Sequence, residues 1–188
     1  EIAYCAMLDG HGGVTVGSEM AGGVKQVYAH HCYMKGNDRA LRIKTRRDRG
    51  KDGIVDDILF QDIRMEGVKM PLIVNSFYFC DADGKSERVQ SREKMPGDET
   101  TPEIGTVCFE RVDASGCKAC VAYAMGLPEK PMKQLTLRNC RFDFDPAAKP
   151  LVPAMALGVE ACSRRGLIVR FLNRLTLRDV RMEGIEGP

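Results

Sequence analysis

The sequence contains no tryptophan, and aromatic residues make up only 6% of its 188 residues. Proteins that bind single-stranded nucleic acid stack the bases on aromatic rings, so this scarcity disfavours such a function. The net charge of +2 is too small to favour general binding to a phosphate backbone. No apolar run approaches the roughly 20 residues that a membrane-spanning helix needs. We therefore expect neither a nucleic acid nor a membrane as a partner.

The cysteines are numerous but offer no metal site. Of the eight, only Cys117 and Cys120 have the spacing of metal ligands, and no second pair follows at a suitable distance. Many unpaired thiols favour a reducing compartment such as the cytoplasm, with the periplasm or the cell exterior as the alternative. The first five residues include no initiator Met, basic segment or apolar segment of a signal peptide, and they read as the middle of a fold.

One apolar pattern recurs five times along the chain. Within each copy, aliphatic residues alternate with polar ones, which is the periodicity of a strand. A second short strand-like segment precedes or follows each copy. The copies are residues 24–34, 55–65, 104–114, 132–142 and 172–182, and the second segments are residues 13–17, 40–45, 71–77, 120–125 and 154–159.

A unit of two short strands cannot bury its apolar face alone, but stacked units share one continuous core. We predict an all-β, right-handed parallel β-helix, truncated at its N-terminus; the hand follows the general preference of parallel crossovers. A leucine-rich horseshoe fits less well because its Leu/Asn consensus is missing. We expect one domain over residues 1–188, with an insertion at about 81–102. One repeat position forms a ladder in which Cys acts as a small hydrophobe; its members are Cys32, Ile63, Val112, Cys140 and Val180.

Two segments carry candidate site residues. His11 lies between glycines, which leave the imidazole unshielded. In residues 40–45, Leu41 and Ile43 should point into the core, while Arg42 and Lys44 point outward on one face. Their Cα atoms should lie about 6.6 Å apart. Two cations on one face favour an anionic ligand, although a solvated basic surface would show the same pattern. His11 and Arg42 lie about one repeat apart, so a shared face is expected if the register is right.

An aromatic run, Phe77-Tyr78-Phe79, ends the next strand-like segment. Aromatic side chains at this position either stack on a sugar or fill a layer of the core, and filling the core is the commoner use. Tyr78 is the most interesting of the three because it carries a polar tip.

Together these motifs resemble the polygalacturonase family of pectin hydrolases, glycoside hydrolase family 28, and the downstream segments are similar to its bacterial, exo-type branch. The resemblance rests on Gly10-His11-Gly12, Gly17-Ser18-Glu19-Met20 and Arg42-Ile43-Lys44-Thr45, followed by Phe77-Tyr78-Phe79, Asp98-Glu99-Thr100-Thr101-Pro102 and Gly126-Leu127-Pro128-Glu129. It implies inverting hydrolysis of α-1,4-linked galacturonate without a metal or other cofactor. It also implies that His11 supports the catalytic acids and that Arg42, Lys44 and Tyr78 bind the substrate.

The family's catalytic aspartates come from motifs upstream of Gly-His-Gly, and these are absent from this chain. Asp56-Asp57 and Asn37-Asp38 lie after that motif and are not substitutes. We therefore expect the C-terminal portion of a pectin-degrading glycosidase, inactive and prone to aggregation in isolation. A non-catalytic module that binds acidic polysaccharide and a purely structural solenoid are the alternatives.

Overall fold

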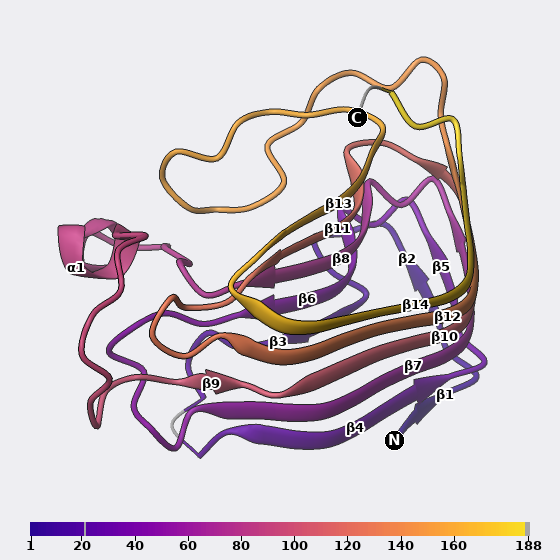
Figure 1. The fold of residues 1–188 in the computed structure, drawn as a ribbon. Coiled ribbons are helices and arrows are strands. Elements are labelled where there is room, and N and C mark those ends of the chain that lie inside the picture. Colours follow the sequence, from indigo (N-terminus) through magenta and orange to yellow (C-terminus); the bar gives the residue numbers. More distant parts are fainter. Residues whose placement is uncertain (21, 187–188) are drawn as a thin grey trace.

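The protein, described here by a computed structural model for residues 1–20 and 22–186, is mostly β and consists of two parallel sheets (Figure 1). The nine-stranded sheet contains β1 (Ile2–Ala3), β2 (Ala6–Leu8), β4 (Val24–His30), β5 (Tyr33–Lys35), β7 (Ile54–Glu66), β9 (Glu103–Ile104), β10 (Thr106–Cys117), β12 (Met132–Phe144) and β14 (Leu172–Glu183). The five-stranded sheet contains β3 (Val14–Val16), β6 (Arg39–Lys44), β8 (Met70–Asn75), β11 (Cys120–Met125) and β13 (Arg165–Arg170). The chain alternates between the two sheets, and each complete coil adds one or two strands to the nine-stranded sheet and one to the five-stranded sheet, which confirms the parallel β-helix.

The long strands of the nine-stranded sheet bend once in every coil, and in Figure 1 they run along the bottom of the molecule and then curve upward. One residue at each bend has a left-handed backbone: His31, Asp62, Arg111, Asn139 and Asp179, with φ between 51° and 53°. Asp and Asn accept this conformation more readily than most residues, because their short polar side chains can hydrogen-bond locally. The ladder pairing skips this residue and then resumes, for example from Glu110–Gln61 to Val112–Ile63.

The residue after each bend belongs to the ladder predicted from the sequence. Val112 pairs with Ile63, and Cys140 pairs with Val180. Cys32 and Cys140 are 3% and 2% exposed. Their thiols thus occupy apolar positions of the core, as a small hydrophobe would.

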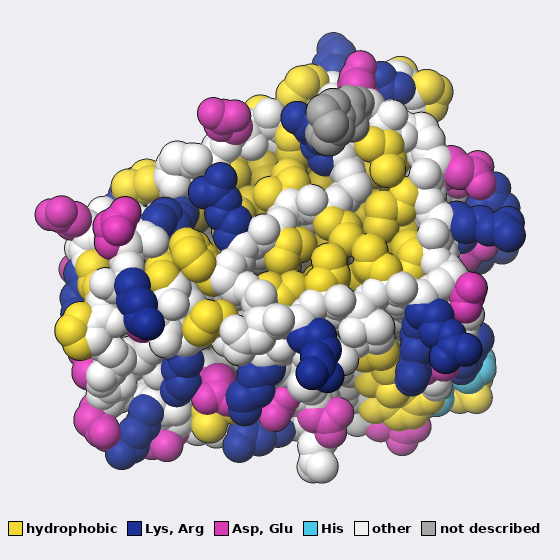
Figure 2. Space-filling view, viewed as in Figure 1, with side chains coloured by type: hydrophobic (Ala, Val, Ile, Leu, Met, Phe, Trp, Pro, Cys, Tyr) yellow, Lys and Arg dark blue, Asp and Glu magenta, His cyan; other side chains and the backbone are white. Residues whose placement is uncertain are grey.

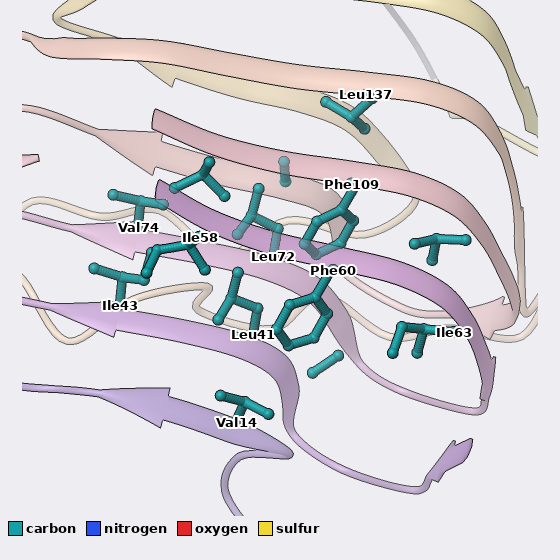
Figure 3. Packing of buried hydrophobic residues seen from close by; sticks show 14 of the residues in the cluster. Val14, Leu41, Ile43, Ile58, Phe60, Ile63, Leu72, Val74, Phe109 and Leu137 are labelled. Carbon is teal, nitrogen blue, oxygen red and sulfur yellow. The ribbon is translucent and has the colours of Figure 1, made fainter. Parts of the chain in front are cut away.

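The core lies between the two sheets (Figure 3). Phe60 and Phe109, one coil apart, stack with their ring centroids 5.3 Å apart and are both fully buried. Leu41 and Leu72 pair on neighbouring strands of the five-stranded sheet and belong to the same core. Burying each such side chain contributes about 1.5 to 3 kcal/mol, so the stack of coils depends on the continuity of these rungs.

The fifth of the second strands is not where the sequence pattern placed it. Residues 154–159 form bends and turns, whereas β13 is Arg165–Arg170. The prediction at 154–159 was wrong because Ala154 and Ala156 are buried in the cluster on the outer face of the five-stranded sheet, outside the coil. In β13 it is Leu167 and Val169 that pack against the inner core.

An excursion between β8 and β9 leaves the coil and carries the short helices η1 (Asp83–Lys85) and α1 (Glu87–Gln90), seen at the left of Figure 1. It contains the region expected as an insertion, about 81–102. Asp81 begins it with a turn, in which Oδ1 accepts a hydrogen bond from the Gly84 N–H at 2.7 Å. No helix among the described residues is long and apolar enough to cross a membrane.

Candidate functional site

The basic strand β6 presents its cations outward, as its alternation predicts. Leu41 and Ile43 are fully buried in the core, whereas Arg42 and Lys44 are partly exposed. The ion pairs found among residues 1–20 and 22–186 include neither cation. Among the described residues, neither cation of this basic face therefore has a carboxylate within ion-pair distance.

Tyr78 lies beside both cations. Its ring centroid is 5.6 Å from Cζ of Arg42 and 4.9 Å from Nζ of Lys44. The Tyr78 N–H donates to the Thr45 carbonyl at 3.1 Å, which fixes the ring against the end of β6. Tyr78 is only 7% exposed, so the ring supports the cations from below and offers little free surface.

The electrostatics of this cluster favour an incoming negative charge. Burial lowers the pKa of Lys44, and the charge of Arg42 lowers it further. Burial raises the pKa of Tyr78, and Cys80 adds to the effect. An anion would relieve the repulsion between Arg42 and Lys44, which is the property expected of a carboxylate site.

A cleft of about 840 Å³ opens next to Lys44 and Tyr78. Its wall includes Thr15, Glu19 and Cys80, none of which was predicted as a site residue. Thr15 pairs with Arg42 in the ladder, so it occupies the same position one coil earlier. The Glu19 side chain is 78% exposed, and the nearest cation is Arg49, whose Nη2 lies 3.7 Å away. Glu19 belongs to the Gly17-Ser18-Glu19-Met20 motif, which was the only signal available for it.

A long segment between β12 and β13, residues 145–162, covers part of the outer face of the five-stranded sheet. Its Met155 is held by its carbonyl, which accepts from Asn75 Nδ2 at 3.1 Å and from the Phe79 N–H at 3.2 Å. The Met155 sulfur accepts a hydrogen bond from Nη2 of Arg42 at 3.5 Å. Arg39 donates to the carbonyl of Pro153 at 3.3 Å. We call residues 145–162 the wall segment, because it borders the cation pair on one side.

His11 does not lie opposite Arg42. Because Thr15 pairs with Arg42, the register places His11 against Asp38, which is 27 residues away. His11 Nδ1 is 2.7 Å from Asp38 Oδ2, and the His11 side chain is 87% exposed. The structure thus brings Arg42, Lys44 and Tyr78 together and places His11 on the preceding coil, with Asp38 as its partner.

The Asp56-Asp57 pair has a structural use. Asp56 Oδ1 accepts hydrogen bonds from the Thr106 N–H at 2.7 Å and from the Asp57 N–H at 2.9 Å. Burial would raise the pKa of Asp56, but these hydrogen bonds outweigh it and lower the pKa. Asp57 is exposed and has a left-handed backbone, with φ 56°. Among the described residues, no group of three or more His, Cys, Asp and Glu side chains could hold a metal ion.

Comparison with known proteins gives three similarities. A family model described as "Glycosyl hydrolases family 28" matches residues 1–93, which include all four predicted site residues. A polygalacturonase of Ralstonia nicotianae is 41% identical over 73 residues, covering 37% of this chain and 13% of that protein. The crystal structure of a hyperthermoactive exopolygalacturonase from Thermotoga maritima is similar over 93% of this chain and 31% of that one, with a TM-score of 0.68 and 25% identity. The chain therefore spans less than a third of the length of either protein.

Proposed function

We propose that this chain, which these comparisons relate to the polygalacturonases of glycosyl hydrolases family 28, forms part of a pectin-degrading glycosidase and supplies the binding site for a galacturonate carboxylate. One observation carries the proposal. Arg42 and Lys44 project from one strand over the ring of Tyr78, at 5.6 and 4.9 Å, and neither has an acidic partner among the described residues. The guanidinium offers a planar fork to a carboxylate and the ammonium a point charge, so the two are complementary to a uronate.

The cleft beside Lys44 also offers polar groups to the rest of the sugar. Thr15 and Glu19 line it with a hydroxyl and a carboxylate, which exchange hydrogen bonds with sugar hydroxyl groups. The wall segment borders Arg42, which donates a hydrogen bond to the Met155 sulfur. Such a boundary suits an exo-acting enzyme, which accepts the end of a polymer, and the solved relative is named as an exopolygalacturonase.

In this proposal, the acid and the base that transfer protons are supplied by groups outside this chain. Inverting glycoside hydrolysis needs an acid and a base with room for a water molecule between them. Asp56 is occupied by Thr106 and Asp57, and Asp38 by His11 and Lys69. In this proposal, the chain by itself binds oligogalacturonate and does not hydrolyse it.

Calorimetric titration of the chain with a galacturonate oligomer tests the proposal. We expect saturable binding that is lost when Arg42→Ala and Lys44→Ala are combined. Arg42→Ala alone should weaken binding by about 1.5 to 3 kcal/mol, the usual range for a charged hydrogen bond. The control combines Arg174→Ala and Arg178→Ala, which removes two exposed cations of β14 and so changes the net charge equally.

Three results would contradict the proposal: no binding by a folded chain, equal binding by the Arg42/Lys44 double variant, or equal losses in both double variants. The last would mean that only net charge matters. Release of galacturonate by the purified chain would refute the assignment of the chemistry to other groups.

A further inference from the structure

The Asp38 carboxylate is surrounded by three basic side chains. Its Oδ2 lies 2.7 Å from Nδ1 of His11, and its Oδ1 lies 2.5 Å from Nζ of Lys69. Nη1 of Arg39 is 3.9 Å from Oδ2. The Asp38 side chain is 21% exposed and that of His11 is 87% exposed. A well-enclosed carboxylate therefore holds one edge of an imidazole whose other edge faces solvent.

The backbone around this pair is fixed across adjacent coils. The Asp38 N–H donates to the carbonyl of Gly10 at 2.9 Å. The Asn37 side chain donates to the carbonyl of Asp9, and the Lys69 N–H donates to the carbonyl of Asn37 at 3.0 Å. Because these turns are hydrogen-bonded to one another, the stacking of the coils sets the position of Asp38 relative to His11.

The ionisation of Asp38 determines where the proton of His11 must lie. Burial would raise the pKa of the Asp38 carboxyl, but hydrogen bonds from Lys69 and His11 outweigh it and hold the pKa below its ordinary value of 3.8. An ionised carboxylate only accepts hydrogen bonds, and a neutral imidazole has one donor and one acceptor. Nδ1 of His11 must then be the donor, and Nε2 is left as the acceptor.

We infer that Asp38 is a positioning residue that holds His11 in the Nδ1–H tautomer and presents Nε2 of His11, as a proton acceptor, to a ligand on the outer face of the coil. The pairing itself stands on the geometry alone. Only the identity of the ligand, a hydroxyl group or water of a galacturonate chain, rests on the proposed function. Lys69 and Arg39 serve Asp38 in turn by keeping it charged. The arrangement matches the general use of a carboxylate to fix the tautomer and orientation of a functional histidine.

Nitrogen NMR of the histidine side chains tests the pairing without any ligand. The chain has three histidines, so His11→Gln assigns the signals of His11 by their loss. In the unaltered chain, when the His11 ring is neutral, we expect Nδ1 to carry the proton. In Asp38→Ala the Nε2–H form should gain population, and in Asp38→Asn a mixture is expected because an amide either donates or accepts. Glu183→Ala, which removes an ion-paired carboxylate of β14, serves as the control.

Two results would overturn the inference: an Nε2–H form in the unaltered chain, or an unchanged Nδ1–H form in a folded Asp38→Ala or Asp38→Asn chain. Circular dichroism establishes folding, and Asp38→Asn keeps the volume of the side chain if Asp38→Ala does not fold.

Titration with a galacturonate oligomer tests the role of Nε2. We expect His11→Gln and Asp38→Ala each to weaken binding by about tenfold, as the loss of one hydrogen bond does. The double variant should lose little more than either single variant, because both changes remove the same contact. Additive losses, or no loss from His11→Gln, would refute the role of Nε2. If the unaltered chain does not bind the oligomer, the proposed function fails, while the NMR result still decides the pairing.

Discussion

The guanidinium of Arg47 meets the carboxylate of Glu129 through two parallel hydrogen bonds. Nε lies 2.7 Å from Oε1 and Nη2 lies 2.9 Å from Oε2, with the two side chains 1% and 2% exposed. Nη1 of Arg47 also donates to the carbonyls of Arg88 and Ser91, both at 2.8 Å. One buried cation thus joins the turn after β6, the excursion around α1 and the turn after β11. The excursion, through Gln90, in turn donates to Phe77 and accepts from Leu157.

Arg47→Ala should lower the free energy of unfolding by about 3 to 5 kcal/mol, because it leaves the Glu129 carboxylate buried without its partner. Urea denaturation followed by circular dichroism measures this change. The control is Arg111→Ala, which removes a similarly bidentate pair with Asp62 on the exposed surface. That change should lower the free energy by no more than about 1 kcal/mol. Equal effects of the two variants would show that burial does not govern the strength of the pair.

Stability should fall in acid partly through Glu129. Burial raises the pKa of this carboxyl, but the hydrogen bond from Arg47 outweighs it, so the pKa in the folded protein lies below its ordinary value of 4.5. A depressed pKa contributes stability that is fully present above 4.5 and is lost as the pH falls through the folded value. The urea midpoint should therefore decline below about pH 4.5, and less steeply in Glu129→Gln, which cannot titrate. Parallel declines in both chains would contradict this assignment.

Alkylation of the native chain should separate the cysteines by burial. Cys5 and Cys80 are exposed, whereas Cys32, Cys117, Cys120 and Cys140 are buried. Burial raises the pKa of Cys117 to about 12, so this thiol is protected from alkylation both by its inaccessibility and by its protonation. The hydrogen bond from Cys120 lowers the pKa of Cys162 to about 7, so Cys162 should react readily wherever the reagent reaches it. Mass spectrometry after brief iodoacetamide treatment measures each site, and early labelling of Cys140 would contradict its place in the core.

Tyr78→Phe should preserve oligogalacturonate binding and Tyr78→Ala should weaken it, because the ring face rather than the hydroxyl supports Arg42 and Lys44. A cation over an aromatic ring contributes about 0.5 to 2 kcal/mol, so we expect a loss of that size in Tyr78→Ala. Calorimetric titration distinguishes the variants. If Tyr78→Phe loses as much as Tyr78→Ala, then the hydroxyl contacts the ligand and the supporting role of the ring is wrong.

The apolar face of the coil formed by β13 and β14 should make the chain self-associate. Figure 2 shows apolar side chains gathered at the centre of this face, and Leu175, Leu177 and Ile185 are 43%, 49% and 43% exposed. Large exposed apolar patches promote association. Light scattering should show a mass that rises with concentration, and Leu177→Glu should reduce this rise. A monomer at all concentrations would contradict the expectation that the isolated chain aggregates.

The repeating part of the molecule could be predicted from the sequence pattern alone. Alternation in residues 40–45 put Leu41 and Ile43 in the core and Arg42 and Lys44 outside, since side chains of a strand point to opposite faces in turn. The recurrence of the pattern gave the stacked parallel coils and the ladder that contains Cys32 and Cys140. These features are local, and a period of two residues fixes them wherever one face of a strand is buried.

The contacts between residues of different coils could not be predicted from the sequence and are seen in the folded chain. The sequence showed that His11 and Arg42 were about a coil apart, but the register paired Thr15 with Arg42 and His11 with Asp38. Nothing in the sequence indicated that residues 145–162 leave the coil, because alanines buried outside the core have the same apolar pattern as a strand inside it. The Arg47–Glu129 pair joins residues 82 positions apart. Such contacts depend on the lengths of the turns and excursions between strands, which set the sequence separation of the residues that become neighbours.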